Sequence, residues 1–353
     1  MSNWESNIRR VTPYVPGEQP KLPDMIKLNT NENPYPPSPG VQKVLREMAA
    51  EELRLYPDPA ASDLAAAIAE RYGVAEDQVF VGVGSDDVLA MAFLTFFNSD
   101  LPILFPDITY SFYDVWADTF RIPYRTIPLN DSFEICPEDY RVPNGGIIFP
   151  NPNAPTGAVL APDAVEQIVR ANPDSVVIVD EAYVDFGAVS ALPLIDRYEN
   201  LLVVQTFSKS RSMAGMRIGY AFGSKKLIRY LQDVKYSFNS YTMNRTSIAL
   251  GVAAIRDEEW FRRTVDRIVK TRERTQQELR ELGFSFRDSG ANFVFASHDR
   301  MPAREIFRRL RERHIFVRYF DRPRIDNYLR ITIGTDEEMD RFFAALREIL
   351  AER

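Results

Sequence analysis

One cysteine, Cys136, and two histidines, His298 and His314, occur among the 353 residues of this chain. A single cysteine excludes an internal disulfide and suits a reducing compartment. Two histidines exclude a histidine-rich metal site, and we predict no bound metal. No uncharged stretch reaches the length of a membrane-spanning helix, and residues 1–5 lack the apolar core of a signal peptide. We therefore expect a soluble, cytoplasmic protein.

The chain also has fewer positive than negative charges. Lysine and arginine number 43 against 50 aspartates and glutamates, which gives a formal net charge of −7. This balance disfavours a general nucleic-acid surface, so local arginines must bind any anionic ligand. The length allows two domains, and a hydrophobic content of 45% with 26% charged residues is ordinary for a globular enzyme.

Lys209 lies in the stretch around which the rest of the chain is organised. It follows the apolar run 201–204, which is predicted to be a buried strand, so the lysine lies just past a strand end. Burial beside cations such as Arg211 and Arg217 would lower the pKa of Lys209 and free its amine to attack a carbonyl. Pyridoxal phosphate is the usual aldehyde cofactor for such an amine. A lone lysine after a strand is more often a solvated loop residue, so this interpretation depends on partners elsewhere.

Side chains near this lysine are suited to bind a phosphate. Thr206 and Ser208 supply hydroxyl groups, and Arg217 supplies a forked cation. The same stretch therefore offers both an amine for an aldehyde and polar groups for the phosphate of such a cofactor.

A second candidate anion site follows the predicted strand 79–83. The strand runs into Gly84, Ser85 and Asp86, and then into an amphipathic helix. The first backbone N–H groups of a helix point toward an anion placed at its start. The alternative is a tight turn in which Ser or Asp merely caps the helix.

Other candidates follow predicted strands that end at positions 105, 149 and 179. Tyr110 could stack on a flat ring, although an isolated tyrosine is more often a core or surface aromatic. Asn153 lies in a stiff, proline-rich loop. Asp180 ends a buried strand, where a carboxylate needs a partner. A protonated pyridine nitrogen is one such partner, and a structural salt bridge is the alternative.

Strands and helices alternate from about residue 79 to residue 223, which predicts an α/β fold with a largely parallel sheet covered on both faces. In that architecture ligands gather at the carboxyl ends of the strands. Gly84, Asn153, Asp180 and Lys209 all fall at such ends. Their convergence is the strongest indication of a site that the residues themselves provide.

The chain divides into three expected parts. Residues 1–40 are rich in proline and asparagine and are predicted to form an extended arm, either a disordered lead-in or a strap across a site. Residues 41–240 form the large domain. Residues 241–353 form a smaller α+β domain, with long charged helices near 242–256 and 258–282.

Together these motifs resemble those of the fold type I pyridoxal-phosphate enzymes, and more narrowly of the histidinol-phosphate aminotransferases. The resemblance runs from Thr12 to Gly334 in the order of the family. Its most specific parts are Ser208-Lys209 with the following Ala214–Gly219, the stretch Val179–Tyr183, and Asn29–Glu32. The implied reaction is amino transfer between L-histidinol phosphate and 2-oxoglutarate in histidine biosynthesis, which yields imidazole acetol phosphate and L-glutamate.

The resemblance implies three catalytic residues and one stacking residue. Lys209 is expected to bond covalently to the cofactor aldehyde and then to move the α-proton of the substrate. Asp180 is expected to keep the ring nitrogen protonated. Tyr183 would hydrogen-bond the phenolic oxygen of the cofactor, and Tyr110 would stack on its ring.

The resemblance also implies how anionic groups are bound. Arg330, aided by Arg318 and Tyr14, is expected to grip the carboxylate or phosphate of the substrate, and Asn31 is assigned to the same site. Tyr56 is expected to reach the cofactor phosphate of a neighbouring subunit, which makes the enzyme an obligate homodimer. The cofactor phosphate within one subunit is assigned to Gly84, Ser85, Asp86, Thr206, Ser208 and Arg217.

One position departs from the family pattern. Many relatives have an asparagine directly before Pro-Thr-Gly, where it bonds the phenolic oxygen, but this chain has Ala154 there. Asn153, one residue earlier, is the replacement candidate, and the alternative is that Tyr183 makes that bond alone. The loss of one hydrogen bond to a charged group is worth roughly 1.5–3 kcal/mol, which would tune the chemistry rather than abolish it.

Other functions are weighed against this one. Aromatic amino acid aminotransferases and phosphothreonine decarboxylases share the fold and its lysine, aspartate and arginines. A dinucleotide-binding oxidoreductase is suggested by Gly82-Val83-Gly84, but the fingerprint needs glycine where the chain has Asp87. Transcription regulators of this fold carry a DNA-binding domain in front, and the proline-rich 1–40 does not suit one.

Overall fold

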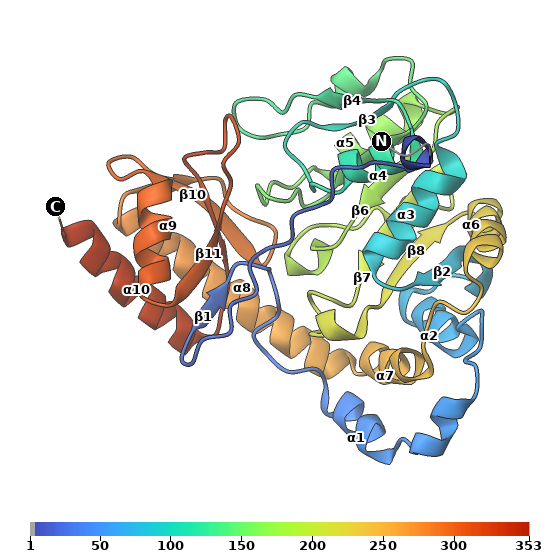
Figure 1. The fold of residues 1–353 in the computed structure, drawn as a ribbon, viewed down its shortest axis with the longest axis horizontal. Helices are drawn as coiled ribbons and strands as arrows, with labels where there is room; N and C mark the ends of the chain where they lie inside the picture. The colour runs from blue at the N-terminus through green and yellow to red at the C-terminus, as the bar shows by residue number, and fades with distance from the viewer. Residues whose placement is uncertain (1–3, 353) are drawn as a thin grey trace.

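The computed structural model describes residues 4–352, and residues 1–3 of the expected arm lie outside the described residues. Two lobes, each built on its own sheet, lie side by side and are connected by the long helix α8 (Glu258–Glu281) (Figure 1). None of the helices in the described part of the chain combines the length and apolar character needed to cross a membrane.

The large sheet has seven strands in the order β2-β8-β7-β6-β5-β3-β4. Only β8 runs against its neighbours, and the other pairs are parallel, as the alternating pattern predicted. Parallel strands carry near-continuous apolar runs because both faces are buried. The strands are β2 (Val79–Gly82), β3 (Ile103–Pro106), β4 (Tyr124–Ile127), β5 (Ile147–Pro150), β6 (Val177–Asp180), β7 (Leu201–Thr206) and β8 (Gly219–Gly223).

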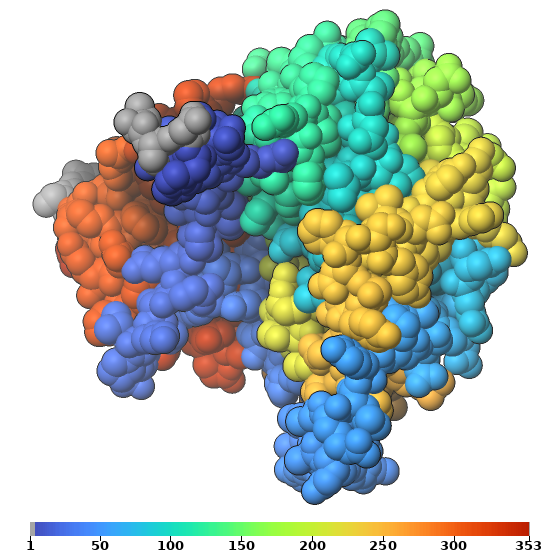
Figure 2. Space-filling view, turned by 45° about the vertical axis from the view of Figure 1, so that its right-hand side comes forward, coloured from blue at the N-terminus to red at the C-terminus, as the bar shows by residue number. Residues whose placement is uncertain are grey.

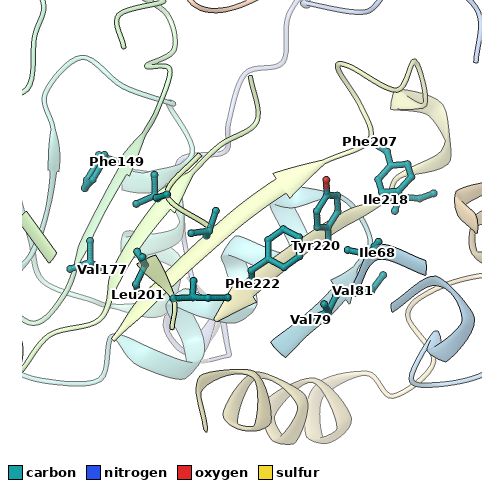
Figure 3. Close-up of a cluster of buried hydrophobic side chains, with 14 of the residues drawn as sticks. Ile68, Val79, Val81, Phe149, Val177, Leu201, Phe207, Ile218, Tyr220 and Phe222 are labelled. Carbon is teal, nitrogen blue, oxygen red and sulfur yellow. The ribbon is translucent and has the colours of Figure 1, made fainter. Parts of the chain in front are cut away.

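Helices cover both faces of this sheet. In β7, Leu201 and Val203 pack into the core shared with α2, α5 and α7, whereas Leu202 and Val204 pack into the core shared with α3, α4 and α6. Figure 3 shows the first core, in which Ile68 of α2 faces the strands. The helices are α1 (Pro39–Glu47), α2 (Ser62–Tyr72), α3 (Ser85–Phe96), α4 (Tyr113–Phe120), α5 (Pro162–Ala171), α6 (Lys225–Phe238) and α7 (Arg245–Arg256).

The small lobe holds a five-stranded sheet in the order β1-β11-β12-β10-β9. Its edge strand β1 comes from the N-terminal arm and pairs in parallel with β11, with Ile26 opposite Ile315. The arm is therefore part of the small sheet as well as an extended segment, and a three-residue strand is too short for periodicity to predict. The elements are β1 (Ile26–Leu28), β9 (Phe284–Phe286), β10 (Phe293–His298), β11 (Ile315–Tyr319), β12 (Leu329–Thr332), α9 (Ala303–Glu312) and α10 (Asp336–Ala351).

The boundary between the lobes differs from the expected one at residue 240. Helix α7 packs against α1 and α2, and Leu250 and Ile255 belong to the core of the large sheet. Residues 245–256 therefore lie in the large lobe, because their apolar side faces α2.

The short 3-10 helices are Glu5–Asn7, Ala50–Arg54, Glu76–Gln78, Pro137–Tyr140, Val184–Phe186, Leu192–Leu194 and Ala214–Met216.

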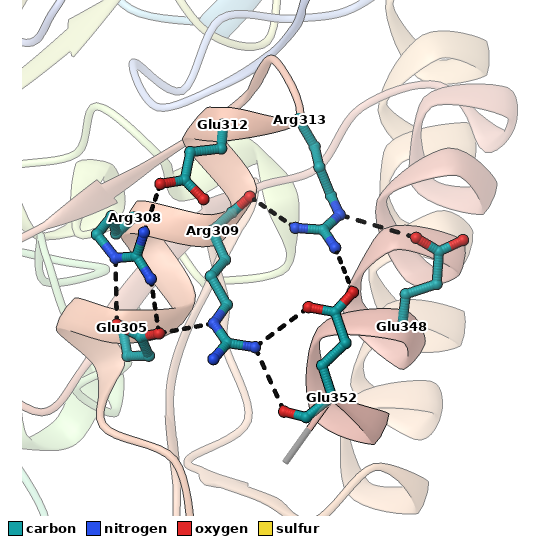
Figure 4. A network of polar contacts seen from close by, with 7 residues as sticks. All are labelled: Glu305, Arg308, Arg309, Glu312, Arg313, Glu348 and Glu352. Carbon is teal, nitrogen blue, oxygen red and sulfur yellow. Dashed lines mark hydrogen bonds and ion pairs between the residues drawn. The ribbon is translucent and has the colours of Figure 1, made fainter.

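Charged side chains connect α9 and α10 at the surface of the small lobe (Figure 4). Arg309 Nη1 lies 3.3 Å from Glu352, and Arg313 Nη2 lies 2.8 Å from the same carboxylate. Exposed pairs of this kind contribute about 0–1 kcal/mol each. The buried side of α10, which includes Phe342, holds the helix in place more strongly.

Candidate active site

A cavity of about 180 Å³ lies where β5, β6 and β7 end and α3 begins. This is the edge of the sheet at which the sequence placed its candidates. Most of the predicted cofactor and catalytic residues share this one cavity. Its lining consists of Thr30, Glu32, Ser85, Asp86, Tyr110, Pro150, Ala154, Asp180, Ala182, Tyr183, Thr206, Ser208, Lys209, Ala214 and Arg217.

Lys209 projects its amine into the cavity from the loop after β7. Its Nζ donates a hydrogen bond to the Thr30 carbonyl at 3.1 Å and lies 5.7 Å from the centre of the Tyr183 ring. Arg211, expected as a cationic neighbour, points elsewhere: its guanidinium lies 4.1 Å from the centre of the Phe261 ring. That expectation was wrong for Arg211, because its long side chain is buried against α7 and α8 rather than beside the lysine.

Asp180 ends β6 and is 5% exposed. Its Oδ2 accepts a hydrogen bond from the Tyr113 hydroxyl at 2.9 Å, and its Oδ1 accepts one from the Ala182 N–H at 3.2 Å. Burial raises the pKa of Asp180 to about 6, although both hydrogen bonds oppose that shift. Because neither partner is a cation, this carboxylate is suited to receive one from a ligand.

Tyr113 is a functional residue that the sequence analysis missed. It is fully buried at the first position of α4, and burial beside Asp180 raises the pKa of its hydroxyl. In the sequence, the stretch 108–113 indicated only that a helix begins there. Thr30 and Glu32 also line the cavity, although the Asn29–Glu32 motif was quoted without a role for either of them.

The start of α3 forms one wall of the cavity. The helix begins at Ser85 directly after Gly84, which has a φ of +84°. The first N–H groups of a helix have no carbonyl partner within it, so those of Ser85 and Asp86 are available. Arg217 Nη2 lies 3.1 Å from Asp86 Oδ2, and the Tyr110 hydroxyl donates to Asp86 Oδ1 at 2.8 Å. Asp86 therefore orients two neighbours in this wall of the cavity.

Two further features complete that wall. The Thr206 hydroxyl donates to the Ser208 hydroxyl at 3.1 Å, so the two hydroxyls lie together in the lining of the cavity. Gly219 lets β8 approach α3 closely, because a Cβ there would lie 2.2 Å from the Gly84 carbonyl carbon. The result is a cluster of N–H groups, hydroxyls and one guanidinium, which is the donor set of a phosphate site.

The predicted substrate residues lie on the small lobe and on the arm. Arg318 of β11 and Arg330 of β12 are directly opposite each other in the sheet. Arg330 Nη2 donates to the Asn29 carbonyl at 3.0 Å, while its buried Nε has no hydrogen-bond partner among the described residues. Burial lowers the pKa of Arg330. Tyr14 stacks on Phe112 at 4.2 Å and, with Arg318, lines a second cavity of about 520 Å³.

Besides Gly84 and the substrate residues Tyr14, Arg318 and Arg330, three predicted residues do not line the first cavity. Asn31 is buried behind it and donates from Nδ2 to the Tyr183 hydroxyl at 2.9 Å, so it orients Tyr183. Asn153 donates to the Ile108 carbonyl at 3.0 Å and lines a separate cavity. Tyr56 is 80% exposed and is remote from this cavity. The structure therefore does not support a direct cofactor contact from Asn153, whose amide nitrogen is used to hold the backbone before Tyr110.

The family model for aminotransferase class I and II matches residues 23–346. Histidinol-phosphate aminotransferase 1 of Hydrogenovibrio crunogenus is 56% identical over 347 residues and covers 98% of each chain. The protein of the same name from Bordetella parapertussis is also 56% identical and covers 99% of each chain.

Solved structures agree with this assignment. Histidinol-phosphate aminotransferase from Sinorhizobium meliloti, in complex with pyridoxal-5'-phosphate, has a TM-score of 0.84 at 25% identity, covering 92% of this chain and 91% of that one. The enzyme of that name from Clostridium acetobutylicum has a TM-score of 0.85 at 21% identity and supports the fold alone, over 93% of this chain and 100% of that one. The chain therefore belongs to the class I and II aminotransferase family and, within it, to the histidinol-phosphate aminotransferases.

Proposed function

We propose that this chain is a pyridoxal-phosphate-dependent aminotransferase that exchanges an amino group between L-histidinol phosphate and 2-oxoglutarate in histidine biosynthesis. The products are imidazole acetol phosphate and L-glutamate. The observation that carries the proposal is the shared cavity of Lys209, Asp180 and Arg217 at the strand ends of a chain of this family. The single cysteine, Cys136, agrees with a cytoplasmic location.

The residues of the cavity fit this cofactor. Asp180 offers a buried carboxylate without a cationic partner, which suits the protonated ring nitrogen. At the wall formed by α3, the N–H groups of Ser85 and Asp86 with Ser208 and Arg217 offer donors for the phosphate. The donor set therefore matches the charge at both ends of the cofactor, a positive ring nitrogen and a negative phosphate.

The bound cofactor supplies an aldehyde and an electron-withdrawing ring. Lys209 provides the amine for that aldehyde, and its Nζ then moves the proton at the α-carbon of the substrate. Asp180 stabilises positive charge on the ring nitrogen. Tyr183, whose hydroxyl accepts a hydrogen bond from Asn31, would donate to the phenolic oxygen of the bound cofactor, and Ala154 would add no hydrogen bond there. Lys209 is therefore the acid–base group of the site, and Asp180 is the group that stabilises charge.

The affinity of the apo-protein for pyridoxal phosphate is expected to fall as the pH is lowered through about 6. Burial raises the pKa of Asp180 to about 6, so below that pH the carboxyl binds a proton and cannot compensate a cation. Each further pH unit should weaken binding by up to about tenfold. Titration of the apo-protein with cofactor across this range measures the slope, which D180N should remove. An affinity that is constant across the range contradicts the assignment.

Arg330 is expected to bind the anionic end of both substrates. R330Q should raise KM for histidinol phosphate and for 2-oxoglutarate by roughly 10- to 100-fold, since charge-assisted hydrogen bonds are lost. R304Q is the control, because Arg304 pairs with Asp321 on the exposed side of α9. Steady-state kinetics with each substrate decides, and a KM within about twofold of the wild-type value would remove Arg330 from the substrate site.

A half-reaction tests the substrate. L-Histidinol phosphate added to the pure holoenzyme should bleach the visible absorbance of the bound cofactor without any keto acid. If only phenylalanine or tyrosine bleaches it, the chain is an aromatic amino acid aminotransferase instead. Release of carbon dioxide from phosphothreonine would identify a decarboxylase. Arg318 lines a cavity with Tyr14, where its guanidinium offers donors for the single phosphate of histidinol phosphate.

A homodimer is part of the proposal. Tyr56 is 80% exposed, and its ring lies tilted against that of Tyr241 with the centroids 4.7 Å apart, which suits a residue that completes the site of a second subunit. The segment around α1 projects from the body of the molecule (Figure 2). Clustered exposed apolar side chains mark protein interfaces, and sedimentation of the pure protein tests for this one. The exposed apolar side chains that are near Tyr56 in sequence, or that contact its ring, are Leu45, Leu53, Leu55 and Tyr241.

A further inference from the structure

Polar side chains form a connected row within the apolar core behind the active site. Glu181 Oε2 accepts a hydrogen bond from Gln205 Nε2 at 2.8 Å, and Gln205 Oε1 accepts one from the Tyr220 hydroxyl at 2.9 Å. The hydroxyls of Tyr220 and Tyr72 are 2.9 Å apart. Glu181, Gln205 and Tyr220 are each at most 3% exposed. Figure 3 shows the Tyr220 hydroxyl among apolar side chains such as Ile218 and Phe207.

The row crosses three neighbouring strands at the level of the cavity. Asp180 ends β6, Thr206 ends β7 and Gly219 begins β8, and these three positions form or abut the cavity wall. Each is adjacent in sequence to one member of the row. Successive residues of a strand point to opposite faces, so every one of these cavity positions has a row member directly behind it.

Glu181 is the end of the row that only accepts hydrogen bonds. In addition to the bond from Gln205, its carboxylate accepts hydrogen bonds from the Ser190 hydroxyl and the Ala191 N–H, each at 2.6 Å. Burial raises the pKa of Glu181 to about 7, although the hydrogen bonds from these three donors oppose that shift. The ionised form of the carboxylate can accept from all three at once. The Gln205 amide nitrogen donates to the Glu181 carboxylate, and the Gln205 amide oxygen accepts from the Tyr220 hydroxyl. These two bonds fix the orientation of the amide.

Charged groups flank the row at both ends. Arg211 lies beside Tyr72, where its positive charge opposes the rise that burial causes in the pKa of that hydroxyl. Asp185 adds negative charge near both Tyr72 and Glu181. A buried polar row costs free energy unless every group is paired, and an apolar core of the same volume is often at least as stable. Stability alone therefore gives no reason for the row.

We propose that Glu181 is a positioning residue for the cofactor site. Through Gln205 and Tyr220 it sets the lateral positions of β6, β7 and β8, and thereby the separation of Asp180 from the phosphate-binding wall. The inference rests on the proposed cofactor, whose positive ring nitrogen and negative phosphate must be bound at the same time. It adds a residue that touches neither cofactor nor substrate.

The row can be broken and then rebuilt with the same atoms. In E181Q, the amide at position 181 turns N–H groups toward partners that also donate, so at least one buried donor loses its acceptor. In E181Q/Q205E, the carboxylate moves to position 205 and accepts from the amide at 181 and from the Tyr220 hydroxyl. The amide oxygen at 181 still accepts the Ala191 N–H, and its second N–H can donate to the Ser190 hydroxyl. Every group from position 181 to Tyr220 is paired again, and only the proton of the half-buried Ser190 hydroxyl loses the carboxylate as its acceptor.

The test is the affinity of four apo-proteins for pyridoxal phosphate, measured by titration of the visible absorbance. E181Q should bind roughly tenfold more weakly than wild type, and E181Q/Q205E should return to within about threefold. T275V is the control, since the buried Thr275 hydroxyl donates to the Thr271 carbonyl within α8 and, among the described residues, no hydrogen bond joins it to the row. It should lower the melting temperature without changing the affinity.

Two results overturn the inference: wild-type affinity in E181Q, or an exchanged variant as weak as E181Q. If E181Q does not fold, E181Q/Q205E decides by itself, because binding within about threefold of wild type supports the row and weaker binding or failure to fold overturns it. Failure of the wild-type protein to bind pyridoxal phosphate is a different result, which overturns the proposed function.

Discussion

Replacement of Lys209 by alanine should abolish transamination while leaving the fold intact. The loss of a positioned general base costs roughly 10²–10⁴-fold in rate, and this variant also loses the amine that bonds the cofactor aldehyde. The side chain makes one hydrogen bond, to the Thr30 carbonyl, so its removal leaves little unpaired. The measurement is kcat with histidinol phosphate and 2-oxoglutarate, together with the melting temperature.

A matched control for this variant is K225A. Lys225 lies at the start of α6, where it pairs with Asp77 at the surface, and its loss should change activity by less than about twofold. Activity in K209A within about tenfold of the wild-type value would show that another residue moves the proton.

Replacement of Asp180 by alanine should lower kcat/KM far more than replacement of Asn153. Removal of one group that stabilises developing charge costs roughly 10²–10³-fold, and D180A also leaves the buried Tyr113 hydroxyl without its acceptor. N153A removes the hydrogen bonds to the Ile108 carbonyl and to the Thr156 hydroxyl, which hold the loop before Tyr110 and the proline-rich loop itself. It should cost about 1 kcal/mol of stability and change kcat/KM by less than about tenfold.

Parallel kinetics and thermal unfolding of the two variants separate these effects. Y113F is the informative companion, because it removes the hydroxyl from Asp180 without removing the carboxylate. An intermediate loss is expected for it. Equal losses in D180A and N153A would mean that Asp180 is not the partner of the ring nitrogen.

Much of the site could be predicted because apolar runs in the sequence mark where the buried strands end. The apolar runs before Asp180 and Lys209 are buried on both faces, and parallel topology brings their carboxyl ends to one edge. The small residues around Gly84 likewise indicated the turn before α3. These are local signals, and the structure brings all three positions to one cavity edge.

What the sequence left undetermined depends on the direction of side chains and on distant pairing. Asn153 and Ala154 are adjacent, but only the backbone of the folded loop decides that Ala154 lines the cavity and Asn153 does not. Asn31 has a φ of +56° and reaches Tyr183 from 152 positions away, a contact that no pattern reports. Strand β1 is stable only because β11 is beside it.

Covalent trapping tests the central claim most directly. The pure protein is loaded with pyridoxal phosphate, reduced with borohydride, digested, and its peptides are weighed by mass spectrometry. We expect the mass of the reduced cofactor on the peptide that contains Lys209 and on no other. A protein that stays colourless and carries no such adduct, or an adduct confined to a different lysine, contradicts the account.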